Sequence, residues 1–192
     1  MIERIRRSFQ DSIAVKEAFL TRYENRIAEV ADTIVAAYKK DHKVLLFGNG
    51  GSATDASHIA GELVNRFNRD RDGLPAIALA SDPSVVTSIS NDYDFQELFS
   101  RQVRAFGRTG DVAIALSTSG NSPNVLRGVE AAKPLGMVTI AFTGKDGGKL
   151  ASMVDYAFIV PSNSTPRIQE THITLAHVLC ELVEDALFPP NR

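Results

Sequence analysis

The sequence predicts an α/β fold in which a parallel five-stranded sheet is flanked by helices. Five short apolar runs, bounded by Gly, Ser, Asn or Asp, have the length and composition of strands: VLLFG at 44–48, AIALA at 76–80, VAIALS at 112–117, VTIAFT at 138–143 and YAFIV at 156–160. None alternates apolar with polar residues, which is typical of strands covered on both faces. Helical patterns separate the runs, so right-handed crossovers and a parallel sheet follow.

The first 40 residues predict two long helices. Apolar residues recur at helical spacing from Ile2 to about Lys40, and the stretch contains neither Gly nor Pro. The apolar faces exceed what one small domain would cover, so residues 1–40 are expected to form an extension that serves homo-oligomerisation. Residues 41–192 complete a single structural domain.

The remaining helices are predicted from the patterns between and after the strands. Their ranges are 52–67, 83–90, 94–106, 122–133, 146–153 and 165–188. The last of them is expected to begin with Thr165 as its cap and Pro166 in its first turn.

Composition and charge exclude several classes of protein. The chain has 192 residues and a formal net charge of -2, with acids and bases interleaved, so it offers no basic field for nucleic acid. Its single cysteine, Cys180, allows neither an internal disulfide nor a cysteine-based zinc cluster. The N-terminus lacks an apolar signal core, and no segment approaches the roughly 20 apolar residues of a membrane span. A cytoplasmic protein without nucleic-acid or membrane partners is expected.

The glycine-rich turn GNGGSA at 48–53 formally matches the G-x-G-x-x-A dinucleotide pattern between a strand and a helix. A dinucleotide site also needs an acidic residue after the second strand, where this chain has the polar stretch SDPSVV with Asp82. The glycines do expose backbone N–H groups at a helix N-terminus, which favour an anion or a polar sugar. From these residues alone, a tight turn and a ligand site are equally consistent with the pattern.

A second turn, STSGNS at 117–122, follows the third strand. It places four hydroxyls around Gly120, those of Ser117, Thr118, Ser119 and Ser122. Hydroxyls and free N–H groups at a helix start form a neutral cradle for a phosphate monoester, without lysine or Mg²⁺. A serine-rich helix cap is the alternative, but the position at the carboxyl edge of a central strand favours phosphate.

Two pairs of side chains suggest acid, base and metal chemistry. His58 and Glu62 are four residues apart, so they share one helix face, and Gln169 and His177 are eight apart on the last helix. Two imidazoles, a carboxylate and an amide oxygen form a plausible zinc set. From the residues alone, a solvated helix face is the more common meaning of such a pair. Four other titratable residues are expected to be structural or solvated: His42, Glu97, Glu170 and His172.

The motifs GNGGS, STSGNS and RIQE, in this order and spacing, resemble those of the sugar isomerase (SIS) domain proteins. Within that superfamily the chain resembles the phosphoheptose isomerases over nearly its full length. The resemblance implies a three-layer SIS fold with a flavodoxin-like strand order. It also implies a homotetramer with sites between subunits, which would let Glu62 and His177 meet from different chains. One departure is Pro166 before RIQE, where some members carry an acidic residue.

The resemblance assigns roles residue by residue. Glu62 and His177 take the catalytic positions. The implied ligands of one Zn²⁺ per subunit are His58, Glu62, Gln169 and His177. The implied substrate contacts are Asn49, Gly50, Gly51, Ser52, Glu62, Asn91, Asp92, Ser117, Thr118, Ser119, Ser122 and Gln169.

The reaction that the resemblance implies converts sedoheptulose 7-phosphate to D-glycero-D-manno-heptose 7-phosphate through an enediol. This is the first step toward ADP-heptose and surface glycans such as lipopolysaccharide. The alternative is a non-catalytic SIS-domain protein that associates with the replication initiator DnaA, which the N-terminal MIERIRRSFQDSI and the C-terminal LFP resemble. Those binding proteins lack the set of acid, base and ligand residues that is complete here, which favours the enzyme.

Overall fold

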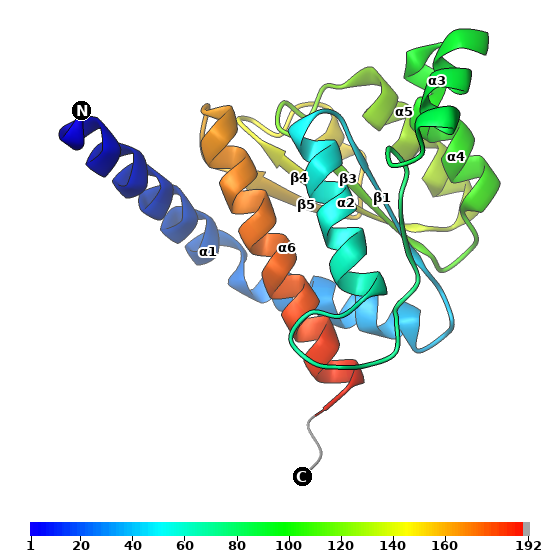
Figure 1. The fold of residues 1–192 in the computed structure, drawn as a ribbon, viewed down its shortest axis with the longest axis horizontal. Coiled ribbons are helices and arrows are strands. Elements are labelled where there is room, and N and C mark those ends of the chain that lie inside the picture. The colour runs from blue at the N-terminus through cyan, green and yellow to red at the C-terminus, as the bar shows by residue number, and fades with distance from the viewer. Residues whose placement is uncertain (190–192) are drawn as a thin grey trace.

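The computed structural model describes residues 1–189 and places one parallel sheet between two layers of helices (Figure 1). The strands are β1 (Val44–Gly48), β2 (Ala76–Ala78), β3 (Val112–Ser117), β4 (Val138–Gly144) and β5 (Tyr156–Val160), in the order β2-β1-β3-β4-β5. All pairs are parallel, which confirms the predicted fold class and the flavodoxin-like order. Every residue of β1 and β3 is buried, as their unbroken apolar runs predict, whereas the edge strands β2 and β5 are partly exposed.

Six α-helices cover the two faces of the sheet. They are α1 (Ile2–Tyr38), α2 (Gly51–Val64), α3 (Pro83–Asp92), α4 (Leu98–Phe106), α5 (Pro123–Ala132) and α6 (Thr165–Leu187). Helices α1, α2 and α6 share one core cluster with the strand residues Leu46, Ile114 and Phe142. Helices α4 and α5 pack against the opposite side chains of the same strands, among them Leu45 and Phe47. The alternation of side chains along each strand thus separates two cores.

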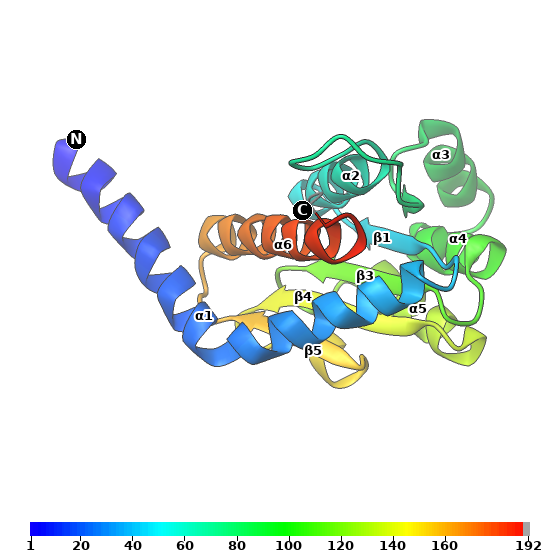
Figure 2. The same ribbon diagram turned by 90° about the horizontal axis from the view of Figure 1, so that it is seen from below.

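The N-terminal segment is one continuous helix of 37 residues, so the predicted pair of helices is wrong. With neither Gly nor Pro in the segment, nothing in the backbone interrupts its hydrogen bonds. From Phe19 onward the helix joins the core, where its aromatic rings pack against Phe158. Its first half projects away from the domain (Figure 2) and leaves several large apolar residues exposed, among them Ile2, Ile5, Phe9 and Ile13. The predicted boundary of the extension at residue 40 stays a prediction.

Other predicted ranges also differ from the structure, and the helix expected at 94–106 is a 3-10 turn at Phe95–Glu97 followed by α4 from Leu98. The segment 146–153 forms only a 3-10 turn at Leu150–Ser152, because Gly147 and Gly148 adopt positive φ angles of 91° and 56° that a right-handed helix excludes. Helix α6 begins after Ser164 rather than after a Thr165 cap, since Ser164 has the extended backbone of an N-cap residue. Helix α2 ends at Val64, three residues early, and the chain then turns toward α6. Within residues 1–189, no helix combines the length and the apolar composition that a membrane crossing requires.

Candidate functional site

The two polar turns lie side by side at the carboxyl edge of the sheet. Gly48 at the end of β1 pairs with Leu116 near the end of β3. Beyond them, Asn49 and the buried Asn124 exchange two side-chain hydrogen bonds, each of 2.8 Å between amide nitrogen and amide oxygen. This reciprocal pair fixes the glycine turn against the start of α5, so both turns face the same region.

The glycine turn is shaped by its backbone. Gly50 has φ of 55° and ψ of -123°, a backbone conformation that residues other than glycine rarely adopt. A Cβ atom on Gly51 would lie 2.1 Å from Nε2 of Gln169, so the amide of Gln169 lies directly over the turn. Gln169 and the glycine turn therefore form one surface at the N-terminus of α2, where the helix dipole favours a polar or anionic group.

In the serine turn, three hydroxyls converge at the start of α5. The Ser117 Oγ atom lies 3.1 Å from the Oγ of Ser122 and 3.5 Å from that of Ser119. Ser122 occupies the N-cap position before Pro123, but its hydroxyl makes no capping hydrogen bond. The serine-rich cap therefore does not account for this hydroxyl, and the turn retains the donors that a phosphate monoester needs.

A cluster of His58, Glu62 and His177 forms where α2 and α6 lie side by side (Figure 1). The Nε2 atom of His58 lies 3.1 Å from Oε1 of Glu62 and 3.5 Å from Nε2 of His177. Ligands of a tetrahedral ion at about 2.1 Å are separated by about 3.4 Å, so these two spacings fit one Zn²⁺-sized ion, and the ligand atoms of Glu62 and His177 lie within 4.8 Å of each other. Glu62 and His177 meet within one chain, and their proximity does not depend on a second subunit.

The surroundings of the cluster add two residues that the sequence did not point to. The ring of Phe67 lies 5.7 Å from the ring of His177, centroid to centroid. Asp55, one turn before His58 on the same face of α2, has a buried Oδ2 atom without a hydrogen-bond partner within residues 1–189. Burial raises the pKa of the Asp55 carboxyl, and nearby His58 opposes that shift. The helical spacing of Asp55 from His58 and Glu62 was the signal that could have revealed it.

The other predicted site residues lie apart from this cluster. Gln169 precedes His177 by eight residues, which is about 12 Å along a helix axis, and it lies at the glycine turn instead. Its role as a metal ligand stays a prediction. Asn91 and Asp92 end α3, where they are exposed and hydrogen-bond each other at 2.8 Å.

The titratable residues that were expected to be structural have structural partners. His172 is buried, with its Nε2 atom 3.0 Å from the carbonyl oxygen of Thr143, and burial lowers its pKa to about 4. Glu97 accepts hydrogen bonds from Ser100, Arg104 and Arg127, which hold its pKa below the ordinary value. Neither of these residues belongs to the cluster.

Comparison with known proteins identifies the family of this chain. A family model described as "SIS domain" matches residues 8–144. A phosphoheptose isomerase of Thermodesulfovibrio yellowstonii is 58% identical over 97% of this chain and 92% of its own length. One from Aquifex aeolicus is 57% identical over 96% of this chain and 97% of its own length.

Solved structures give the same result. The phosphoheptose isomerase of Neisseria gonorrhoeae superposes with a TM-score of 0.90 at 42% identity, covering 95% of this chain and 98% of that one. The phosphoheptose isomerase of Francisella tularensis superposes with a TM-score of 0.92 at 37% identity, covering 96% of this chain and 98% of that one.

Proposed function

Because the chain belongs to the SIS domain family and, within it, to the phosphoheptose isomerases, we propose that it converts sedoheptulose 7-phosphate to D-glycero-D-manno-heptose 7-phosphate. Its relatives indicate that the chain is a sugar phosphate isomerase. The identity of the sugar is the part that we propose. One observation carries it: a His-Glu-His cluster lies on the same two helices whose N-terminal ends meet at the glycine turn.

The proposed chemistry is proton transfer between adjacent carbons. Glu62 removes the proton from the carbon beside the carbonyl of the open-chain sugar and returns it to the neighbouring carbon through an enediol. A ring nitrogen of His177 lies within 4.8 Å of a carboxylate oxygen of Glu62. His177 is proposed to exchange protons with the carbonyl and hydroxyl oxygens of the sugar, or to open the sugar ring. Each well-placed acid or base of this kind contributes roughly 10²- to 10⁴-fold to the rate.

The substrate is proposed to extend from the cluster to the two turns. The hydroxyls of Ser117, Ser119 and Ser122 support a phosphate seat, because they converge at a helix N-terminus. Asn49 and Gln169, held at the glycine turn, are proposed to bind hydroxyls of the sugar chain.

The proposed cofactor is one Zn²⁺ per subunit, held by His58, Glu62 and His177. Two imidazoles and a carboxylate suit this ion, and its bound form would stabilise negative charge on the substrate oxygens. The proposed assembly is a homotetramer, supported by the exposed apolar row on the first half of α1. A site between subunits would also allow Gln169 to serve as a ligand. The proposed setting is the cytoplasm, at the first step toward ADP-heptose and lipopolysaccharide.

Turnover of sedoheptulose 7-phosphate by the purified protein tests the proposal. Glu62→Gln and His177→Gln should each abolish isomerisation while circular dichroism and melting temperature stay unchanged. Glu181→Gln, an exposed carboxylate on α6 one turn after His177, is the matched control and should retain full activity. Near-normal turnover in either cluster variant would refute the assignment.

The metal is tested separately by elemental analysis of the purified protein and by turnover before and after chelation. Loss of activity with a chelator and its return with Zn²⁺ are expected. The binding-only alternative predicts no turnover and capture of DnaA in a pull-down, and the isomerase names of the similar proteins argue against it.

A further inference from the structure

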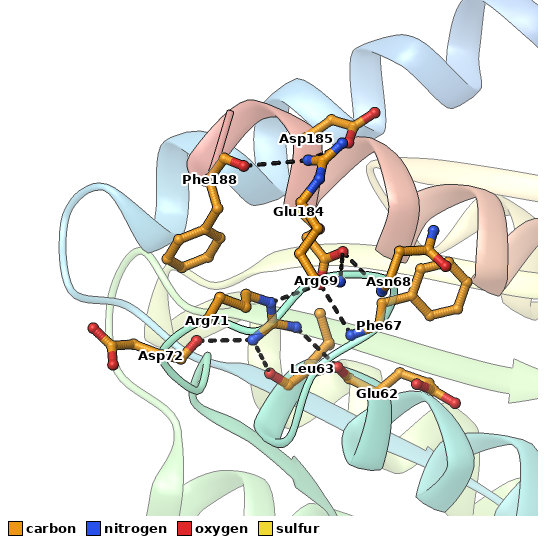
Figure 3. Close-up of polar contacts among 10 residues, drawn as sticks. All are labelled: Glu62, Leu63, Phe67, Asn68, Arg69, Arg71, Asp72, Glu184, Asp185 and Phe188. Carbon is orange, nitrogen blue, oxygen red and sulfur yellow. Dashed lines mark hydrogen bonds and ion pairs between the residues drawn. The ribbon is translucent and has the colours of Figure 1, made fainter. Parts of the chain in front are cut away.

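A buried ion pair between Arg71 and Glu184 lies beside the cluster, on and next to the same two helices (Figure 3). The Nε atom of Arg71 donates to Oε2 of Glu184 at 2.9 Å, and the two side chains are only 2% and 1% exposed. Glu184 follows His177 on α6, and Arg71 lies in the loop that follows α2. Neither residue has a place in the isomerisation chemistry.

The Glu184 carboxylate holds the loop after α2 against α6. It accepts backbone N–H groups from Phe67, Asn68 and Arg69 at 2.9, 2.8 and 2.9 Å, besides the Arg71 guanidinium. Burial opposes its charge, yet these four donors hold the pKa of Glu184 below its ordinary value. The carboxylate is thus charged and fully hydrogen-bonded at neutral pH.

The Arg71 guanidinium holds the end of α2. It donates to the carbonyl oxygens of Glu62 and Leu63 at 2.9 Å each, and to that of Asp72 at 2.9 Å. The first two carbonyls belong to the last turn of α2, which lacks intrahelical partners, and the positive charge complements the helix dipole there. One of the two carbonyls is that of Glu62 itself, so the backbone of the proposed base is tied through Arg71 to α6.

Phe67 connects the same pair to His177. Its backbone N–H is bound by Glu184, and its ring lies 5.7 Å from the His177 ring at an interplanar angle of 35°. The aromatic contact restricts how the imidazole can turn. The ion pair therefore acts on the cluster at two points, the backbone of Glu62 and the ring of His177.

A role in stability alone would not require a charged pair here, because well-packed apolar residues commonly replace buried ion pairs without loss. We propose that Arg71 and Glu184 are positioning residues, which set the spacing of Glu62 and His177 and thereby the metal affinity and turnover of the site. This inference rests on the proposed function and identifies the residues that hold the side chains of the cluster at their spacing.

The test compares Glu184→Gln with Asp185→Asn in the full chain. Asp185 forms an exposed ion pair with Arg69, at 2.6 Å, between the same loop and the same helix, and within residues 1–189 no hydrogen bond or ion pair joins it to Glu62 or Phe67. Titration of metal-free protein with Zn²⁺ should show a loss of affinity of about 10- to 100-fold for Glu184→Gln, the range typical of groups that orient metal ligands. The value of kcat should fall by a similar factor, with KM for the sugar phosphate within about twofold. The Asp185→Asn control should match the parent protein in all three values.

Phe67→Leu supplies a second variant for the case in which Glu184→Gln fails to fold. It keeps the backbone hydrogen bond to Glu184 and removes only the ring that contacts His177. A reduced Zn²⁺ affinity and kcat at an unchanged melting temperature are expected. A folded Glu184→Gln within twofold of the parent, an unchanged Phe67→Leu, or an equal loss in Asp185→Asn would overturn the inference. Zinc titration needs no sugar, so a parent protein that leaves sedoheptulose 7-phosphate unchanged would refute the proposed substrate without deciding the positioning role.

Discussion

Two groups of titratable side chains lie on and beside the same pair of helices, and they differ in burial and in hydrogen bonding. In the cluster, the side chains of His58 and Glu62 are 47% and 27% exposed. In the neighbouring pair, Arg71 and Glu184 are 2% and 1% exposed, with four donors on the carboxylate. The cluster has ligand atoms that face one another with few protein partners, whereas the hydrogen bonds of the pair are nearly complete.

The difference in burial and hydrogen bonding separates side chains that stabilise the fold from side chains that are available to a metal or a substrate. A buried charge is stable only when its hydrogen bonds are made, so Arg71 and Glu184 are committed to the structure. Exposed groups near one another retain free lone pairs, which a metal or a substrate can take. We therefore expect a graded series of effects on the free energy of unfolding, largest at the buried pair and smallest in the cluster.

The largest loss of stability is expected for Glu184→Ala. Removing the carboxylate leaves the Arg71 guanidinium buried without its counter-ion, which typically costs about 3–5 kcal/mol. Urea unfolding monitored by circular dichroism measures this change. Asp185→Asn, at the exposed pair with Arg69, should cost at most about 1 kcal/mol. Equal costs for the two variants would remove the distinction between the buried and the exposed groups.

The second effect concerns His172, which is buried, whereas His177 on the same helix is partly exposed. Its pKa of about 4 lies below the ordinary value near 6.5, so the folded protein holds it neutral. Stability from this residue is complete above about pH 6.5 and is lost as pH falls toward 4, by about 3 kcal/mol in total.

Urea unfolding at several pH values between 7 and 4, in the parent protein and in His172→Gln, isolates this contribution. Because carboxylates such as Glu184 titrate in both proteins, the difference between the two curves reports the histidine alone. Parallel curves would show that His172 is not held neutral by burial.

A smaller effect is expected for Asn124→Ala at the edge of the sheet. The substitution removes both 2.8 Å hydrogen bonds with Asn49, and a lost buried partner costs about 2 kcal/mol. Thermal unfolding gives the stability, and KM for the sugar phosphate should rise because the glycine turn loses its anchor. An unchanged KM would mean that Asn49 needs no support from α5.

The smallest effect on stability is expected for Glu62→Gln in the cluster. Its side chain is partly exposed, and it pairs with the exposed His58, so the change should stay within about 0.5 kcal/mol. Urea unfolding beside the turnover assay checks both properties of one variant. A destabilisation above about 1 kcal/mol would place Glu62 with the structural group and weaken the comparison.

Several predictions from local sequence held because short-range patterns control them. The five strands lie where their apolar runs occur, and Ser122 and Pro123 begin α5 as their residue types indicate. The errors also have local causes. A pair of N-terminal helices requires a break, but α1 contains no helix-breaking residue in its 37 positions. A helix over 146–153 conflicts with the positive φ angles of Gly147 and Gly148.

The sequence by itself determined the α/β fold class, the two polar turns at the strand ends and the shared face of His58 and Glu62. Each depends on residues a few positions apart, whose spacing is set by the backbone. Only the tertiary structure decided that His177 meets His58, 119 residues away, that Gln169 lies over Gly51, and that Arg71 pairs with Glu184, 113 residues away. The physical reason is that these contacts depend on how α2 and α6 pack together on one face of the sheet, and periodicity along the chain carries no information about that arrangement.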